Sequence, residues 1–262
     1  MTDLLARHDD GPVAVLTLSD PATLNALSDG MLAALGDALA DLAGSDARAV
    51  VLRGEGRAFC AGHHLGEMQA VRQAPDGGRA AFADLFDRCA AVMAAIRALP
   101  QPVIAQVHGL ATAAGCQLVA TCDMSVAAED ARFGVNGVDI GLFCSTPMVA
   151  LTRNVGRKRA FEMLATGRFL SAAEAVEAGL VNRVVPADVL EEETMALARR
   201  VAGKPRGAVR IGKAAFHAQA ERPVDEAYAL ARDAMVLNLA EADTEEGMAA
   251  FLEKRPPGWT RG

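Results

Sequence analysis

Apolar positions follow two different spacings along the first two-thirds of the chain. Four short runs are almost continuously apolar and rich in β-branched residues: 13–20, 49–54, 102–109 and 124–130. Runs of this kind predict buried strands. Apolar residues at helical spacing predict a helix over about 31–42, with Ser28 as its N-cap. The same spacing predicts a second helix over about 79–99, which Pro100 ends.

Strands and helices alternate in this part of the chain, and the pattern then changes. A strand-then-helix order predicts an α/β core whose buried strands are largely parallel. After about Ala187 the spacing is almost entirely helical, with candidate helices at 190–202, 206–220, 224–240 and 244–254. We therefore expect a core of residues 1–187 that carries the site, and a helical region of residues 188–262 that packs against a neighbouring subunit.

The charge and the cysteine content argue against several classes of function. The net charge of −7 and the pI near 5.3, without a run of lysine or arginine, argue against an extended nucleic-acid surface. No segment reaches the ~18 consecutive apolar residues of a membrane span. Five cysteines form an odd set without a CxxC pair, which favours reduced thiols over disulfides or zinc. These features predict a soluble cytoplasmic protein without a metal site, a membrane partner or a nucleic-acid partner.

Two segments place backbone amides where a ligand could reach them. They are RAFCAGHHLGEM, residues 57–68, and GLATAAGCQL, residues 109–118. In the second, Ala113 and Ala114 fall in the expected first turn of a helix, where N–H groups lack intrahelical partners and the dipole favours negative charge. Two such donors that converge form an oxyanion hole. Small residues also occur where a helix packs tightly on a sheet, so the residues alone leave both interpretations open.

The same two segments carry a resemblance to a known family. AFCAGHHLGEM and VHGLATAAGCQLVATCD closely resemble the two signature segments of the crotonase superfamily, which includes enoyl-CoA hydratases and isomerases. The similarity continues through FEMLATGRFLSAAEAVEAGLVNRVVP and FLEKRPPGW, so it covers nearly the whole chain. Within the superfamily, GLATAAGCQLVATCD and IGLFCSTPMVAL look most like the mitochondrial enoyl-CoA hydratase domain-containing type-three group.

The resemblance implies a fold, a ligand and an assembly. The fold is an α/β crotonase-type spiral of ββα units with a helical C-terminal trimerisation region. The ligand is an acyl-CoA thioester as substrate, without a further cofactor, and the assembly is a homotrimer or a dimer of trimers. The resemblance places the two oxyanion amides on His63 and Ala114. It also implies coenzyme A contacts from six residues: Asn25, Ala26, Leu27, Ala61, Leu65 and Lys254.

The sequence departs from the family pattern at both hydratase glutamates. Gln117 stands beyond the second oxyanion amide, and Gly137 stands within FGVNGVDIG, at the positions that the resemblance gives to glutamate. A carboxamide can orient water but cannot accept its proton, and glycine has no side chain. General acid–base groups each contribute about 10² to 10⁴ in rate. We therefore expect slow hydration with enolate stabilisation retained. Glutamates restored at both positions should raise the rate more than the single changes would together.

Two nearby ionisable residues are candidates to replace these carboxylates. Asp139 lies in the apolar run VDIGLF, where a buried acid would have a raised pKa; the alternative is an aspartate turned outward. His64 could transfer protons near neutral pH, or contact only adenine or solvent. The pair of histidines with Glu67 does not complete a metal-ligand spacing. Cys144 lacks an identifiable His/Asp partner, which argues against a covalent nucleophile.

Three functions remain open from the sequence. The first is a divergent enzyme of the enoyl-CoA hydratase/isomerase type that stabilises a thioester enolate. The second is an acyl-CoA-binding protein without catalysis. The third is a decarboxylase or thioesterase on the same fold, since loss of CO₂ forms an enolate without a glutamate that abstracts a proton. Turnover and binding of a panel of acyl-CoAs would separate the three.

Overall fold

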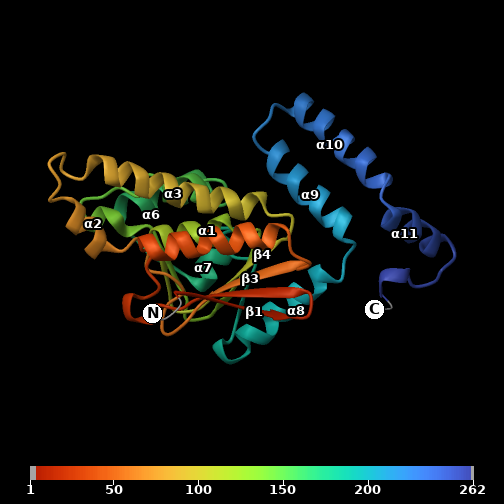
Figure 1. The fold of residues 1–262 in the computed structure, drawn as a ribbon, viewed down its shortest axis with the longest axis horizontal. Helices are drawn as coiled ribbons and strands as arrows, with labels where there is room; N and C mark the ends of the chain where they lie inside the picture. The colour runs from red at the N-terminus through yellow and green to blue at the C-terminus, as the bar shows by residue number, and fades with distance from the viewer. Residues whose placement is uncertain (1–3, 261–262) are drawn as a thin grey trace.

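The computed structural model describes residues 4–260, and its largest element is a six-stranded sheet (Figure 1). Its strands, in spatial order, are β1 (Leu5–Asp10), β2 (Val13–Leu18), β3 (Ala49–Gly54), β4 (Val103–Val107), β6 (Met124–Ala128) and β9 (Arg183–Val185). β1 and β2 are antiparallel, and every other neighbouring pair is parallel. The strands expected from the apolar runs are β2, β3, β4 and β6. The prediction of an α/β core with largely parallel strands is therefore confirmed.

A second sheet lies apart from the main one. Within the described residues it contains β5 (Leu110–Thr112), β7 (Arg132–Gly134) and β8 (Leu170–Ser171). β5 and β7 are parallel, with Thr112 paired to Gly134, so their carboxyl ends lie next to each other. In parallel sheets, ligands bind outside the carboxyl ends of the strands. The residues that follow β5 and β7 are therefore well placed to form a site.

Helices cover both faces of the main sheet. α1 (Asp29–Ala43) and α3 (Arg79–Ala98) lie side by side on one face and bury their apolar stripes against it. Ser28 caps α1 as expected, because its hydroxyl accepts from Met31 N at 3.1 Å. α8 (Leu190–Ala202) covers the opposite face. Burial on both faces explains why the strand sequences are continuously apolar.

The shorter helices surround the second sheet and the loops beside it. They are α2 (Leu65–Val71), α4 (Ala114–Thr121), the 3₁₀ helix η2 (Asn136–Ile140), α5 (Pro147–Leu151), α6 (Arg157–Thr166) and α7 (Ala172–Glu177). Among these, α4 and η2 begin next to the ends of β5 and β7. None of the helices in residues 4–260 combines the length and the apolar character needed to span a bilayer.

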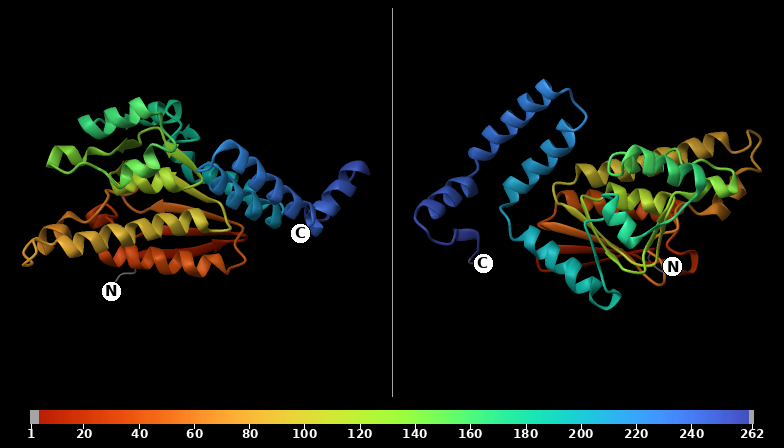
Figure 2. Two further views of the ribbon diagram at one scale, coloured as in Figure 1. Left: turned by 90° about the horizontal axis from the view of Figure 1, so that it is seen from above. Right: turned by 180° about the vertical axis from the view of Figure 1, so that it is seen from behind.

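The last three helices extend away from both sheets (Figures 1 and 2). α9 (Arg206–Gln219), α10 (Val224–Leu239) and α11 (Ala242–Leu252) lie close to the predicted ranges. α10 buries no residue, and large apolar side chains such as Tyr228, Phe251 and Leu252 are exposed. These helices therefore present apolar surface that the described part of this chain leaves uncovered.

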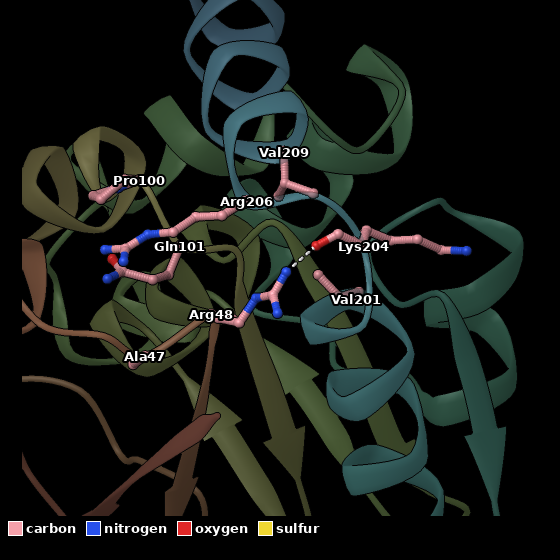
Figure 3. A pocket seen from close by; sticks show the side chains of 8 residues that line it. All are labelled: Ala47, Arg48, Pro100, Gln101, Val201, Lys204, Arg206 and Val209. Carbon is pink, nitrogen blue, oxygen red and sulfur yellow. Dashed lines mark hydrogen bonds between the residues drawn. The ribbon is translucent and has the colours of Figure 1, made fainter. Parts of the chain in front are cut away.

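Polar contacts, one of them buried, join this helical region to the core. Lys213 of α9 is 8% exposed, and its ammonium donates to two backbone carbonyls and to Asp123, at 2.6 Å. Arg48, directly before β3, donates to the carbonyl of Lys204 between α8 and α9 (Figure 3). The cavity drawn there has a volume of about 10 Å³, the space of a single water molecule. This place is a structural junction and is too small for a substrate.

Candidate active site

The candidate site is a cavity of about 370 Å³ beside the carboxyl ends of β5 and β7. Its volume is in the range of small-molecule sites. The wall comes from Phe86 of α3 and from residues within the segments 61–68, 112–114 and 136–147. No aspartate, glutamate, lysine or arginine is among the described residues that line it. Within residues 4–260, no cluster of three or more His, Cys, Asp or Glu side chains is placed to hold a metal ion.

Two glycines allow the two motif segments to touch. Gly62 has a φ of +90°, and a Cβ built on it would lie 2.9 Å from the Ala113 Cβ and 3.2 Å from the Ala114 N. A Cβ built on Gly115 would overlap the carbonyl oxygen of Cys60. Both positions are closer than side chains allow, so glycine is required for the approach. The contact holds the residue after Gly62 next to the first residue of α4.

The amides of His63 and Ala114 are left without acceptors by this packing. Neither N–H donates to any backbone or side-chain group in the described part of the chain. Ala114 is the first residue of α4, where a helix has no internal acceptor to offer. Both residues line the cavity. The described chain thus leaves two N–H donors without acceptors, both on residues that line one cavity.

Ala113 turns the chain sharply before α4. Its φ of 49° and ψ of −120° are unusual for a residue with a Cβ. Such conformations cost about 1–3 kcal/mol and persist only where the surrounding structure holds them. Here the Ala113 N–H donates to the Gly134 carbonyl at 2.9 Å, which ties the turn to β7. The turn directs the next amide, that of Ala114, toward the cavity.

The side chain of His63 takes part in packing. Its ring meets the Phe86 ring edge-on, with centroids 5.6 Å apart. Both ring nitrogens are buried, and within residues 4–260 neither makes a hydrogen bond of ordinary length and angle. Burial lowers the pKa of this imidazole, so the ring is neutral near pH 7. The His63 side chain therefore adds no charge to the cavity wall.

The two positions that the family pattern gives to glutamate differ in where they lie. Gln117 is 6% exposed and is not part of the cavity wall; its Oε1 is buried without a partner within the described residues. Gly137 does line the cavity, but a Cβ there would overlap the Leu142 carbonyl oxygen and lie 2.9 Å from the Cys144 Sγ. A glutamate at position 137 would therefore require the loop around residue 142 to move. Restoring both glutamates is a larger change than the sequence suggested.

The two candidate replacements for these carboxylates are not among the residues that line the cavity. Asp139 is exposed, and its carboxylate packs against Gly167 at the end of α6. His64 caps α2, with its Nδ1 accepting from the Glu67 N–H at 3.1 Å. Of the two interpretations given for Asp139, the outward orientation is the one observed. Of the thiols, Cys144 lines the cavity, and burial raises its pKa, so it stays protonated.

The residues expected to contact coenzyme A are divided between two environments. Ala61 and Leu65 line the cavity. Asn25, Ala26 and Leu27 are buried, and the Asn25 amide donates to three backbone carbonyls between residues 55 and 59. That side chain therefore braces the loop that leads to the cavity, while the adjoining backbone remains the part that could meet a ligand.

The remaining expected contact lies far from the others. Lys254 is exposed after α11, at the opposite end of the molecule from α2 (Figures 1 and 2). Within one chain it is not brought to the cavity. A contact between this lysine and a ligand in the cavity would therefore need a different copy of the chain.

Sequence reasoning missed one polar pair in the cavity wall. The Thr112 hydroxyl donates to Asn136 Oδ1 over 2.6 Å, and both residues line the cavity. Thr112 is the last residue of β5, and Asn136 is the first residue of η2, directly after Val135. No local pattern marked these two residues, because β5 and β7 are three residues long and neither strand was predicted.

The sequence and the fold have close parallels among known proteins. The chain matches the family model described as enoyl-CoA hydratase/isomerase over residues 8–262. It is 47% identical over 256 residues to the Homo sapiens protein called enoyl-CoA hydratase domain-containing protein 3, mitochondrial, covering 97% of this chain and 82% of that protein. A crystal structure of that human protein is similar with a TM-score of 0.93 and 45% identity, over 98% of this chain and 100% of the other. A crystal structure of enoyl-CoA hydratase from Mycobacterium smegmatis is similar with a TM-score of 0.94 and 54% identity, over 98% of each chain.

Proposed function

Because the chain belongs to the enoyl-CoA hydratase/isomerase family and has its α/β crotonase fold, we propose that it binds an acyl-CoA thioester in the cavity beside β5 and β7. The thioester oxygen lies between the amides of His63 and Ala114. The observation that supports this is that both N–H groups lack acceptors in the described chain and line one cavity.

The pair of amides suits a reaction that places negative charge on the thioester oxygen. As an enolate forms, the oxygen becomes an oxyanion and its hydrogen bonds strengthen. Removal of one donor from such a site typically costs about 2.7–4 kcal/mol of transition-state stabilisation. The donors are uncharged and held by packing, so little reorganisation is needed when charge develops. Enolate stabilisation is therefore the chemistry that this cavity supports best.

Fast hydration of an enoyl thioester is not part of the proposal. Hydration needs a group that takes a proton from water and a group that delivers one to carbon. The described lining residues include no carboxylate, and the amide of Gln117 cannot accept a proton. The hydratase activity in the names of the relatives belongs to those proteins and is not assigned to this chain.

Decarboxylation is the second candidate, and the same lining favours it. When a thioester with a carboxylate on Cα loses CO₂, the electron pair of the broken C–C bond forms the enolate, and water supplies the proton that completes the product. No side chain has to act as a base. The lack of an ionised carboxylate in the described wall therefore disfavours hydration without disfavouring this reaction.

The proposal is tested by acyl-CoA binding and turnover with a donor-deletion variant. Ala114→Pro removes one amide hydrogen at the first position of α4; because proline restricts the residue before it and Ala113 has a φ of 49°, circular dichroism and urea unfolding first establish that the variant is folded. Arg157→Pro makes the same change at the first position of α6, away from the cavity, and is the matched control. We expect calorimetry to detect butyryl-CoA binding that weakens in Ala114→Pro and not in Arg157→Pro. If no acyl-CoA binds the wild-type protein, the proposal is wrong; binding without turnover of enoyl-, malonyl- or saturated acyl-CoAs would favour a silent binding protein.

We also propose that the protein works as a homotrimer or a dimer of trimers in the cytoplasm. The exposed apolar side chains of α10 and α11 support an assembly, because such helices are stable when another subunit covers them. A neighbouring subunit would also bring its own Lys254 toward the cavity. The region of residues 188–262 then serves mainly in assembly, while α8 within it also packs on the main sheet.

A further inference from the structure

The strongest unexplained feature of the cavity is its pair of hydrogen-bonded polar side chains. Thr112 is 8% exposed, and its hydroxyl is 2.6 Å from Asn136 Oδ1. Most of the remaining wall is apolar, with Leu65, Ile140 and Phe143 among its members. A part-buried polar pair in such an apolar wall is a candidate contact for a polar group of a bound ligand.

The hydrogen bond determines which atom of Asn136 is left for that partner. Oδ1 accepts from the Thr112 hydroxyl, so the free end of the amide is Nδ2 with two N–H donors. Nδ2 has no hydrogen-bond partner within residues 4–260, and it is not one of the buried polar atoms that lack a partner. It is therefore at least partly accessible, and Asn136 is one of the residues that line the cavity.

Asn136 and Ala114 follow the ends of two paired strands. Thr112 pairs with Gly134, and the Ala113 N–H donates to the Gly134 carbonyl at 2.9 Å. Ala114 follows the end of β5 and Asn136 follows the end of β7. Neighbouring strands lie ~4.8 Å apart. Donors separated by about one strand spacing suit two oxygens carried on C1 and C3 of the same acyl chain.

We propose that Asn136 selects acyl-CoA thioesters that carry an oxygen on C3. This inference rests on the proposed function, because the thioester oxygen on C1 must occupy the amides of His63 and Ala114. The C3 oxygen accepts a hydrogen bond from Asn136 Nδ2. It is a keto oxygen in a 3-oxoacyl-CoA and a carboxylate oxygen in malonyl-CoA.

Thr112 is the positioning residue for this contact. Its hydroxyl holds the amide oxygen of Asn136, so the amide nitrogen is the atom directed to the ligand. Without that hydroxyl the amide can rotate and present its oxygen, which repels a C3 oxygen. Loss of the hydroxyl therefore reduces selectivity without removing any group that contacts the ligand.

The test is a comparison of three affinities measured by calorimetry on the full-length protein. Butyryl-CoA is the reference, acetoacetyl-CoA carries the keto oxygen, and malonyl-CoA carries the carboxylate. One added neutral hydrogen bond gives about a five-fold preference for acetoacetyl-CoA over butyryl-CoA, and a charged acceptor gives more than about ten-fold for malonyl-CoA. The two arms distinguish a keto from a carboxylate substrate.

Three variants assign any preference to the proposed pair. Asn136→Asp keeps an acceptor for Thr112 but removes both N–H groups, so the acetoacetyl-to-butyryl preference falls to about one and malonyl-CoA binds more weakly than butyryl-CoA. Thr112→Val reduces the same preference. Asn182→Asp is the control, since Asn182 Oδ1 also accepts one hydrogen bond, from Ser125 N, away from the cavity; its preference matches the wild type.

The outcomes separate this inference from the function on which it rests. If butyryl-CoA binds but neither acetoacetyl-CoA nor malonyl-CoA is preferred, the role of Asn136 is wrong and acyl-CoA binding stands. A preference that survives Asn136→Asp contradicts the inference in the same way. If none of the three thioesters binds, the proposed function itself is overturned.

Discussion

Replacing Gly62 by alanine tests whether close contact between the two motif segments builds the site. The added Cβ would lie 2.9 Å from the Ala113 Cβ and 3.2 Å from the Ala114 N, and the φ of +90° is unfavourable for any residue with a Cβ. The change thus adds backbone strain and also pushes the segment before His63 away from α4. The strain should lower the free energy of unfolding, and the displacement should weaken ligand binding.

The two effects can be separated with a control glycine. Gly11 has a φ of +57°, and nothing lies within 4 Å of a Cβ built on it, so Gly11→Ala adds strain without a collision. That strain costs about 1–2 kcal/mol of unfolding free energy. Gly62→Ala should cost about 1–3 kcal/mol more than Gly11→Ala, which is the usual penalty for overpacking.

Urea unfolding and calorimetry with butyryl-CoA measure the two quantities. Displacement of the His63 amide removes one hydrogen bond to the thioester, so Gly62→Ala should weaken binding about two- to ten-fold. Gly11→Ala should bind as tightly as the wild type. If the two variants lose equal stability and both bind normally, the approach of the segments at Gly62 does not set the geometry of the site.

Three further predictions follow from other parts of the structure. Ala113→Gly should raise the free energy of unfolding, measured in urea, by about 0.5–2 kcal/mol, because relief of backbone strain exceeds the entropy cost of glycine. An unchanged or lower value would mean that the turn at Ala113 is unstrained. The wild-type protein should hydrate crotonyl-CoA slowly, as measured by the loss of the enoyl absorbance. Gln117→Glu should add little to this rate, because a carboxyl buried in place of the amide stays protonated. Vigorous wild-type hydration would show that another group acts as the base. Phe251→Glu combined with Leu252→Glu should reduce the particle mass found by light scattering. The two side chains are 82% and 77% exposed in the single chain, and we propose that a neighbouring subunit covers them. A monomeric wild type at micromolar concentration would contradict that proposal.

The parts of the fold that the sequence predicted are those with strong local signals. The buried strands β2, β3, β4 and β6 are continuous apolar runs, and α1 combines an apolar stripe with the Ser28 cap. β1 has the polar sequence LARHDD and exists because it pairs with β2 at the sheet edge. β5, β7 and β8 are two or three residues long, so their pairing is decided by tertiary contacts that no local pattern records.

The site shows the same division between local and non-local information. The glycine-bearing segments around His63 and Ala114 were evident from sequence, and the structure adds the reason for the glycines at positions 62 and 115. The sequence left the direction of the Asp139 side chain open between two alternatives, and in η2 this residue is exposed. The pair of Thr112 and Asn136 depends on the register between β5 and β7, which the sequence did not reveal.

The most direct test of the account is the ¹³C NMR signal of butyryl-CoA labelled at the thioester carbonyl carbon. Hydrogen bonds from the amides of His63 and Ala114 would polarise this carbonyl, so the signal should move downfield when the ligand saturates the protein. Ala114→Pro should reduce that movement, and Arg157→Pro should retain it. A saturated complex in which the carbonyl signal stays at its position in free solution would contradict the central claim that these two amides hold the thioester oxygen.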